Sequence, residues 1–234
     1  MSAAATPTAA ELAAEFALRK EDDPVSLRRE RIAVHLPQLT LEAELALPFA
    51  ARALLVLVAS CASGDDDARL EAALQREGFA TLRLDLLQSA ECRYADAPNH
   101  LPLLTERLLA LIAELHRQIA LDAIPALPIG LIGGGQTTPL VVRVAAQRDR
   151  DVRALVCHGG LIDLAGRQYL KVLQAPLLLL AAAGDSAALA NAERARPYLP
   201  GVCRVETLTE TDAETYAARR AALTAAWFRC HLAA

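Results

Sequence analysis

The sequence predicts an α/β domain built on a mostly parallel sheet of about eight strands, of which the first two form an antiparallel hairpin. Short, uninterrupted apolar runs of strand length alternate with segments of helix length. Two segments of alternating hydrophobicity come before the first of these runs. A continuous apolar run is typical of a strand covered on both faces, whereas alternation is typical of a strand with one solvated face. The 234 residues suffice for one such domain.

The N-terminal segment is expected to form a helical extension outside the main domain. Leu12 and Phe16 lie on one side of the helix, and the charged run 19–24, closing with Pro24, ends it. This predicts an extension over residues 1–28 and a main domain over 29–234. No basic segment precedes an apolar run here, so we expect no secretory signal and a cytoplasmic location.

The main domain is expected to begin with a hairpin. Segments 31–36 and 39–47 both alternate with a period of two, and Pro37 and Gln38 separate them. The inward-facing positions of the second segment should be Leu41, Ala43, Leu45 and Leu47.

After residue 53 the pattern becomes a strand and helix alternation. The expected strands are 54–59, 80–84, 129–132, 152–157, 177–183 and 203–208. The expected helices are 65–77, 102–118, 139–147, 187–198 and 213–231. Right-handed crossovers bring the C-terminal ends of parallel strands to one edge of the sheet, and ligands bind there in such folds.

Composition excludes several classes of partner. The net charge is −4, and the 24 basic and 28 acidic residues are interspersed, which leaves no positive patch suited to nucleic acid. The longest apolar stretches, 53–59 and 175–183, are too short to cross a bilayer, so no membrane span is expected.

Cysteine and histidine usage predicts neither a disulfide nor a metal site. The five cysteines are odd in number, widely spaced and without a CxxC pair, so each is expected to be a small buried residue. Histidines also lack neighbours at metal-ligand spacing. We therefore expect no metal and no cofactor. The cysteines are Cys61, Cys92, Cys157, Cys203 and Cys230.

Several stretches resemble the dienelactone-hydrolase-like branch of the α/β-hydrolases, over most of residues 31–232. They are 78–87, 152–160 with 163–166, 175–180 before Gly184-Asp185, and 227–232. The resemblance implies a three-layer α/β-hydrolase-type sandwich with a nucleophile, a histidine base and an orienting acid.

At the nucleophile the sequence departs from that family. The resemblance implies a serine on a sharp turn between strand and helix, and the matching segment here is 130–139. In the register set by Gly133, the nucleophile position falls on Gly135. Glycine has no atom that can attack a carbonyl carbon.

The resemblance also fails at two further positions. The family's base falls on Ala213 or a neighbouring residue, in the segment 209–214, which contains no histidine. Its His-Gly pair near the oxyanion hole is matched by Ser60 and Cys61. Asp185 stands where the orienting acid belongs. Because a triad works as a unit, we expect esterase activity near background.

The glycine run 133–135 has other interpretations. It resembles a phosphate cradle at the start of a helix, but Thr138 stands where a dinucleotide fingerprint needs glycine. The alternatives are that the glycines relieve strain in the turn and that they bind another anion or a polar ligand. Thr138 and Pro139 suit an N-cap and first helical position, whereas a threonine nucleophile at 137 or 138 would need a shifted turn and a base.

Cys157 and His158 end one predicted strand. The thiol or the imidazole could take part in a different reaction if Cys61 or Asp185 lay within hydrogen-bond distance. Alternation along a strand argues against both facing one pocket. Asp185 also fits an ordinary turn or N-cap.

The preferred hypothesis is a non-catalytic hydrolase homologue that binds a small molecule or a protein. There are two alternatives: a hydrolase with a non-standard site, and a structural subunit that pairs with an active relative. The sequence does not decide whether the chain forms a homo-oligomer. The expected cleft residues are Ser60, Cys61, Gly134, Gly135, Gln136, Cys157, His158 and Asp185.

Overall fold

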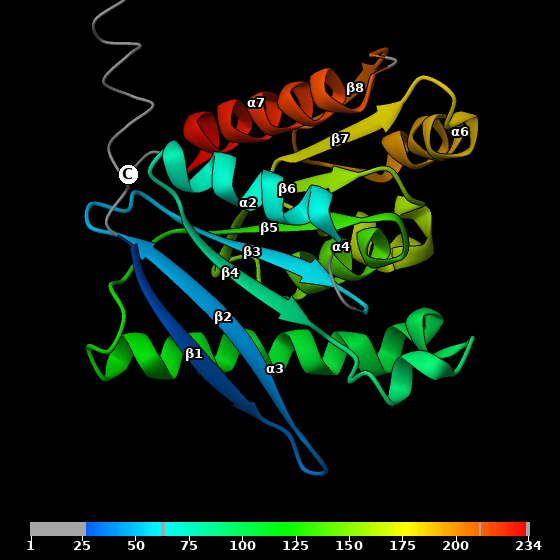
Figure 1. The fold of residues 1–234 in the computed structure, drawn as a ribbon. Coiled ribbons are helices and arrows are strands. Elements are labelled where there is room, and N and C mark those ends of the chain that lie inside the picture. The colour runs from blue at the N-terminus through cyan, green and yellow to red at the C-terminus, as the bar shows by residue number, and fades with distance from the viewer. Residues whose placement is uncertain (1–26, 62–63, 211, 233–234) are drawn as a thin grey trace, which may run out of the picture.

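The computed structural model describes residues 27–61, 64–210 and 212–232. They form one sheet with helices on both faces (Figure 1). The expected helical extension lies outside the described residues, except for Leu27 and Arg28, which begin the first strand.

The sheet has eight strands in the order β1-β2-β4-β3-β5-β6-β7-β8. β1 pairs with β2 and β2 with β4 antiparallel, and every other pair is parallel. The predicted fold class and hairpin are therefore confirmed. The strands are β1 Leu27–His35, β2 Thr40–Pro48, β3 Leu54–Ala59, β4 Ala80–Asp85, β5 Ile129–Gly134, β6 Val152–His158, β7 Leu177–Ala182 and β8 Cys203–Leu208.

Side-chain alternation sets which face of the hairpin is buried. In β2, Leu41, Ala43 and Leu45 are buried, whereas Glu42 and Glu44 point to solvent. Leu47, expected to face inward, is only partly buried. The central strands β3, β5 and β7 are buried on both faces for five of their six residues, because helices cover both sides.

Helices form two outer layers. α2 and α7 lie together on one face, and α3, α4 and α6 lie on the other (Figure 1). Among the described residues, no helix has both the length and the apolar character needed to cross a membrane. The helices are α2 Asp65–Arg76, α3 Leu101–Ala120, α4 Thr138–Gln147, α5 Arg167–Leu170, α6 Ser186–Ala195 and α7 Ala213–His231.

Phe228 of α7 packs directly on β5 because residue 130 is a glycine. A Cβ atom added to Gly130 would lie 2.5 Å from Cε1 of Phe228 and 2.9 Å from Cδ2 of Leu55. Phe228 is fully buried and also makes an edge contact with Phe79. This close approach of the ring to the strand backbone sets the distance between α7 and the face of the sheet.

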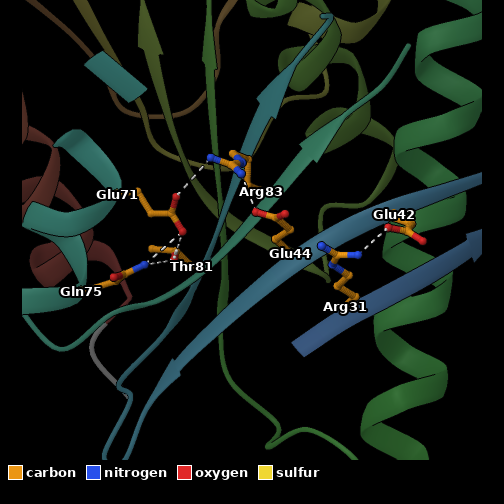
Figure 2. A network of polar contacts seen from close by, with 7 residues as sticks. All are labelled: Arg31, Glu42, Glu44, Glu71, Gln75, Thr81 and Arg83. Atoms are coloured by element: carbon orange, nitrogen blue, oxygen red, sulfur yellow. Dashed lines mark hydrogen bonds and ion pairs between the residues drawn. The ribbon is translucent and has the colours of Figure 1, made fainter. Parts of the chain in front are cut away.

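A polar network ties α2 to the sheet (Figure 2). Thr81 of β4 is fully buried, and its hydroxyl donates to Oε1 of Glu71 at 2.9 Å. Nε2 of Gln75 donates to Oγ1 of Thr81 at 2.8 Å and to Oε1 of Glu71 at 3.0 Å. Arg83 joins Glu71 to Glu44 of β2. The network satisfies polar groups that would otherwise be buried without partners.

Candidate functional site

The turn after β5 has the backbone shape of a strained strand-to-helix turn at Gly135. This residue begins the short 3₁₀ helix η3 (Gly135–Thr137), its φ is +53°, and it is exposed. A Cβ atom added there would have no atom within 4 Å. The left-handed conformation favours glycine, yet the space beside it is open. The residue expected at the nucleophile position therefore presents only backbone to the sheet edge.

Both threonine hydroxyls next to Gly135 hold the turn. Oγ1 of Thr137 accepts from the N–H of Gly134 at 2.9 Å and lies 3.1 Å from the carbonyl oxygen of Val58. Oγ1 of Thr138 donates to the carbonyl oxygen of Gly159 at 2.8 Å. α4 begins at Thr138, one residue earlier than expected, so Thr137 occupies the N-cap position. Because its hydroxyl contacts Gly134 and Val58 in the preceding strands, Thr137 makes no side-chain capping hydrogen bond to α4.

The loop after β6 packs against this turn. A Cβ atom added to Gly160 would lie 2.2 Å from the carbonyl oxygen of Gly135 and 2.8 Å from Cβ of Thr138. Gly159 and Gly160 have φ values of +67° and +82°. A Cβ atom on Gly159 would lie 3.2 Å from Oδ2 of Asp185, which brings that carboxylate to the same edge.

Asp185 caps a helix. Its Oδ1 accepts from the backbone N–H of Ala188 at 3.0 Å, at the start of α6. This is the ordinary N-cap role weighed for this residue from the sequence. Asp185 stands at the C-terminal end of β7, so the position matches an orienting acid as well.

The connection from β8 to α7 is short. β8 ends at Leu208, and α7 starts at Ala213, with Asp212 as N-cap. Oδ1 of Asp212 accepts from the N–H of Thr215 at 2.8 Å. Ala213, where the resemblance implied the base position, is the first residue of the helix.

The expectation that no cysteine pairs was wrong. Cys61 and Cys92 form a disulfide, with their Cα atoms 6.0 Å apart. The two lie 31 residues apart in sequence, but they follow β3 and β4, neighbouring parallel strands whose ends meet at one edge. The prediction of buried thiols also fails for Cys230, which is exposed, and for Cys203, which is half-buried.

Cys157 and His158 face opposite sides of the sheet, as alternation predicts. Cys157 is buried towards α4, and burial raises the pKa of its thiol to about 12. A thiol with this pKa is protonated at neutral pH and a poor nucleophile.

His158 faces α7. Its Nε2 lies 3.2 Å from Oγ1 of Thr224, whose hydroxyl donates to the carbonyl oxygen of Arg220 at 2.8 Å. Because that hydroxyl proton is already used, Nε2 of His158 is the donor. Burial, and then the positive charge of Arg220, lower the pKa of His158 to about 3, so its ring is neutral at pH 7.

Two cavities flank the Gly135 turn, and Gln136 lines both. The polar cavity, about 430 Å³, lies between α2, α7 and the ends of β3, β5 and β6. Its polar side chains are Ser60, Asp67, Gln136, Thr137, His158 and Arg220.

The apolar cavity, about 510 Å³, lies on the side of α3 and α4. None of the described residues that line it is charged. Its lining comprises Pro98, Asn99, Leu101, Gly135, Gln136, Pro139, Gly160, Leu161 and Leu164.

The structure brings together part of the expected cleft. Ser60, Gly134, Gln136 and His158 line the polar cavity, and Gly135 lines the apolar one. Cys61 is held in its disulfide, Cys157 is in the core, and Asp185 caps α6.

Sequence reasoning missed Arg220 and Asp67, because each lies within a helix whose charged residues all read as surface. The described part of the chain holds no cluster of three metal-ligating side chains.

No family model matches the sequence. Two Mycobacterium tuberculosis proteins, from strains CDC 1551 and H37Rv, are 30% identical to it over 182 residues, or 76% of this chain. Both carry the provisional name phosphoribosyl transferase. The chain spans 40% of the length of these relatives.

Solved structures of esterases and a dienelactone hydrolase share the fold. The dienelactone hydrolase from Anabaena variabilis ATCC 29413 matches with a TM-score of 0.78 at 24% identity, covering 88% of this chain and 99% of that one. Est1E from Butyrivibrio proteoclasticus matches at 0.65 and 12% identity, over 85% and 99%. The esterase domain of a Rhodothermus marinus protein matches at 0.65 and 17% identity, over 88% and 99%.

Proposed function

We propose that this chain, which has the α/β-hydrolase fold, is a non-catalytic member of that fold and binds a small ligand at the sheet edge without hydrolysing it. The observation that carries the proposal is Gly135, which occupies the strand-to-helix turn with φ +53° and open space where a side chain would stand. The turn keeps its geometry, but it offers no nucleophilic atom.

The groups around Gly135 do not replace the missing hydroxyl. Thr137 and Thr138 hold the turn and the neighbouring loop through their own hydroxyls. The thiol of Cys157 is buried on the α4 side, where its pKa is raised to about 12. A nucleophile needs an adjacent base or a lowered pKa, and neither threonine nor this thiol has one.

A base is missing from its usual place as well. Ala213 begins α7, and the imidazole that lines the polar cavity, that of His158, hydrogen-bonds to Thr224 on α7. Asp185 is engaged with Ala188 in the α6 cap. Removal of nucleophile and base together leaves the level of catalysis that binding and backbone donors alone provide.

What favours binding is the pair of cavities on either side of the turn. Each has the volume of a small-molecule site. One has several polar side chains in a mixed lining, whereas the lining of the other is mostly apolar. A ligand that enters both would contact Gln136. The transferase name of the mycobacterial relatives is a weaker guide, because only 40% of their length matches this chain.

Ester turnover tests the proposal directly. Purified protein incubated with short-chain nitrophenyl esters and with a dienelactone should release product at the uncatalysed rate. Turnover that scales with protein concentration and is lost in a Cys157→Ala or Asp185→Asn variant would instead support the alternative, a hydrolase with a non-standard site. Light scattering of the purified protein, alone and mixed with an active relative, addresses the subunit alternative.

A further inference from the structure

We propose that the polar cavity binds an oxyanion, the carboxylate or phosphate group of a small ligand, through the guanidinium group of Arg220. This names a ligand class for the binding site proposed above and therefore rests on that proposed function. The cavity is separate from the apolar cavity beside Gly135, although Gln136 lines both.

Arg220 lines the cavity with donors to spare. Its Nη2 donates to the carbonyl oxygen of Asp66 at 2.7 Å, which uses one of five N–H groups. Its Nε is buried and has no hydrogen-bond partner in the described part of the chain. An atom with so little exposed surface cannot contact a ligand in the cavity, so the donors available to a ligand are the Nη groups that Asp66 leaves free.

The charge of Arg220 is also uncompensated by a direct ion pair. Within residues 27–61, 64–210 and 212–232, no carboxylate oxygen lies within 4.0 Å of its guanidinium nitrogens. The neighbouring Arg219, by contrast, lies 3.9 Å from Oε1 of Glu210. A guanidinium group that faces a polar cavity in this way is suited to two parallel hydrogen bonds with a carboxylate or phosphate.

The positive charge of Arg220 acts on a second residue of the cavity lining. After burial, it is the second cause of the lowered pKa of His158. His158 is therefore neutral and does not add charge. Ser60 and Gln136 add a hydroxyl and an amide that can donate to the same anion.

One lining residue opposes anion binding. Asp67, in the first turn of α2, places a half-buried carboxylate at the cavity. Like charges repel, so Asp67 should weaken the site without abolishing it. The proposal thus predicts opposite effects from removing the two charges: loss of affinity at Arg220 and gain at Asp67.

The experiment measures binding of inorganic phosphate and of acetate by ¹H–¹⁵N NMR titration of the whole chain at constant ionic strength. We expect saturable shifts around Gly134, Gln136 and His158 with at least one of the two probes. Arg220→Gln should weaken binding about tenfold or more. Asp67→Asn should tighten it about two- to fivefold.

Arg219→Gln is the matched control, because it removes the same charge from the adjacent position of the same helix outside the cavity lining. The affinity of the Arg219→Gln variant for phosphate and acetate should equal that of the unmodified chain. Arg220→Lys keeps the charge and a donor towards Asp66, so an intermediate affinity in that variant separates loss of binding from loss of folding. Saturation by phosphate alone would identify a phosphate ligand, and saturation by acetate alone a carboxylate.

Absence of saturable binding by both probes would overturn the proposal. So would equal weakening by Arg219→Gln and Arg220→Gln, or a loss of affinity in Asp67→Asn. These outcomes are distinct from failure of the proposed function, which shows itself as ester turnover and does not depend on any anion.

Discussion

The carbonyl oxygen of Gly135 lies 2.2 Å from the position that a Cβ atom on Gly160 would occupy. A Cβ atom added to Gly135, by contrast, would have no atom within 4 Å. Both residues have a positive φ, so an alanine at either position adopts an unfavourable φ, and the two positions differ in the space around the added methyl group. The turn at Gly135 is thus tightly packed on one side and open on the other.

Alanine at these two positions should give different stabilities. Gly135→Ala should lower the free energy of unfolding by about 1–2 kcal/mol, the cost of a left-handed conformation for alanine. Gly160→Ala should cost about 2 kcal/mol more, because its methyl group collides with backbone. Urea denaturation of both variants measures the difference. Equal losses of stability would show that the loop after β6 does not pack against the turn at Gly135.

The disulfide should be detectable as a deficit of free thiols. Thiol titration of denatured, unreduced protein should give three thiols, from Cys157, Cys203 and Cys230, and reduction should give five. Closing a loop of this size contributes about 3–4 kcal/mol to stability, so reduction or a Cys61→Ser, Cys92→Ser double variant should lower the denaturation midpoint.

Five thiols before reduction would contradict the pairing. Disulfides persist mainly in oxidising compartments, so the cytoplasmic location expected from the sequence stays a prediction, which alkylation of thiols in intact cells would test.

Stability should fall in acid because of His158. The unfolded imidazole takes up a proton near pH 6.5, but the folded ring does not until about pH 3. Between these values the unfolded state binds more protons, so the free energy of unfolding decreases as pH falls, by at most about 1.4 kcal/mol per pH unit. Partial exposure of the ring reduces this slope.

His158→Gln should flatten the pH profile between pH 6.5 and 3. His116→Gln is the control, because its ring is exposed and lies at the other end of the sheet, 3.4 Å from Asp151. An unchanged profile in His158→Gln would contradict the assigned environment.

The α2 network should be more sensitive than a surface hydrogen bond of the same kind. Thr81→Val removes one partner from both Gln75 and Glu71 in a buried setting, which should cost about 1–3 kcal/mol. Thr40→Val removes an exposed contact to Nδ1 of His35, at 3.1 Å, and should change stability by less than about 0.5 kcal/mol. Thermal denaturation compares the two, and similar losses would argue against the network.

Much of the fold was predictable because strands buried on both faces appear in the sequence as uninterrupted apolar runs. The bounds of β3 and β8 agree with those expected, as do those of α7. Helix starts shifted where capping decides them. α3, for example, begins at Leu101, because Nδ1 of His100 accepts from the N–H of Leu103.

The candidate site was predictable only in part. The strand-to-helix turn at Gly135 could be predicted because the residues that indicate it are neighbours in the sequence. The disulfide and the cavity lining by Arg220 depend on which segments meet in space. Cys61 and Cys92, like Arg220 and His158, come together only through the order of strands and the placement of α7. Spacing along the chain carries no such information.

The proposal that the chain has no working nucleophile is tested most directly by mass spectrometry of the intact protein after exposure to a fluorophosphonate. This reagent reacts covalently with activated serine and related side chains. The account predicts an unchanged mass at every reagent concentration that fully labels an active esterase of the same fold. A stoichiometric adduct, mapped by peptide analysis to a side chain at the C-terminal edge of the sheet, would contradict it.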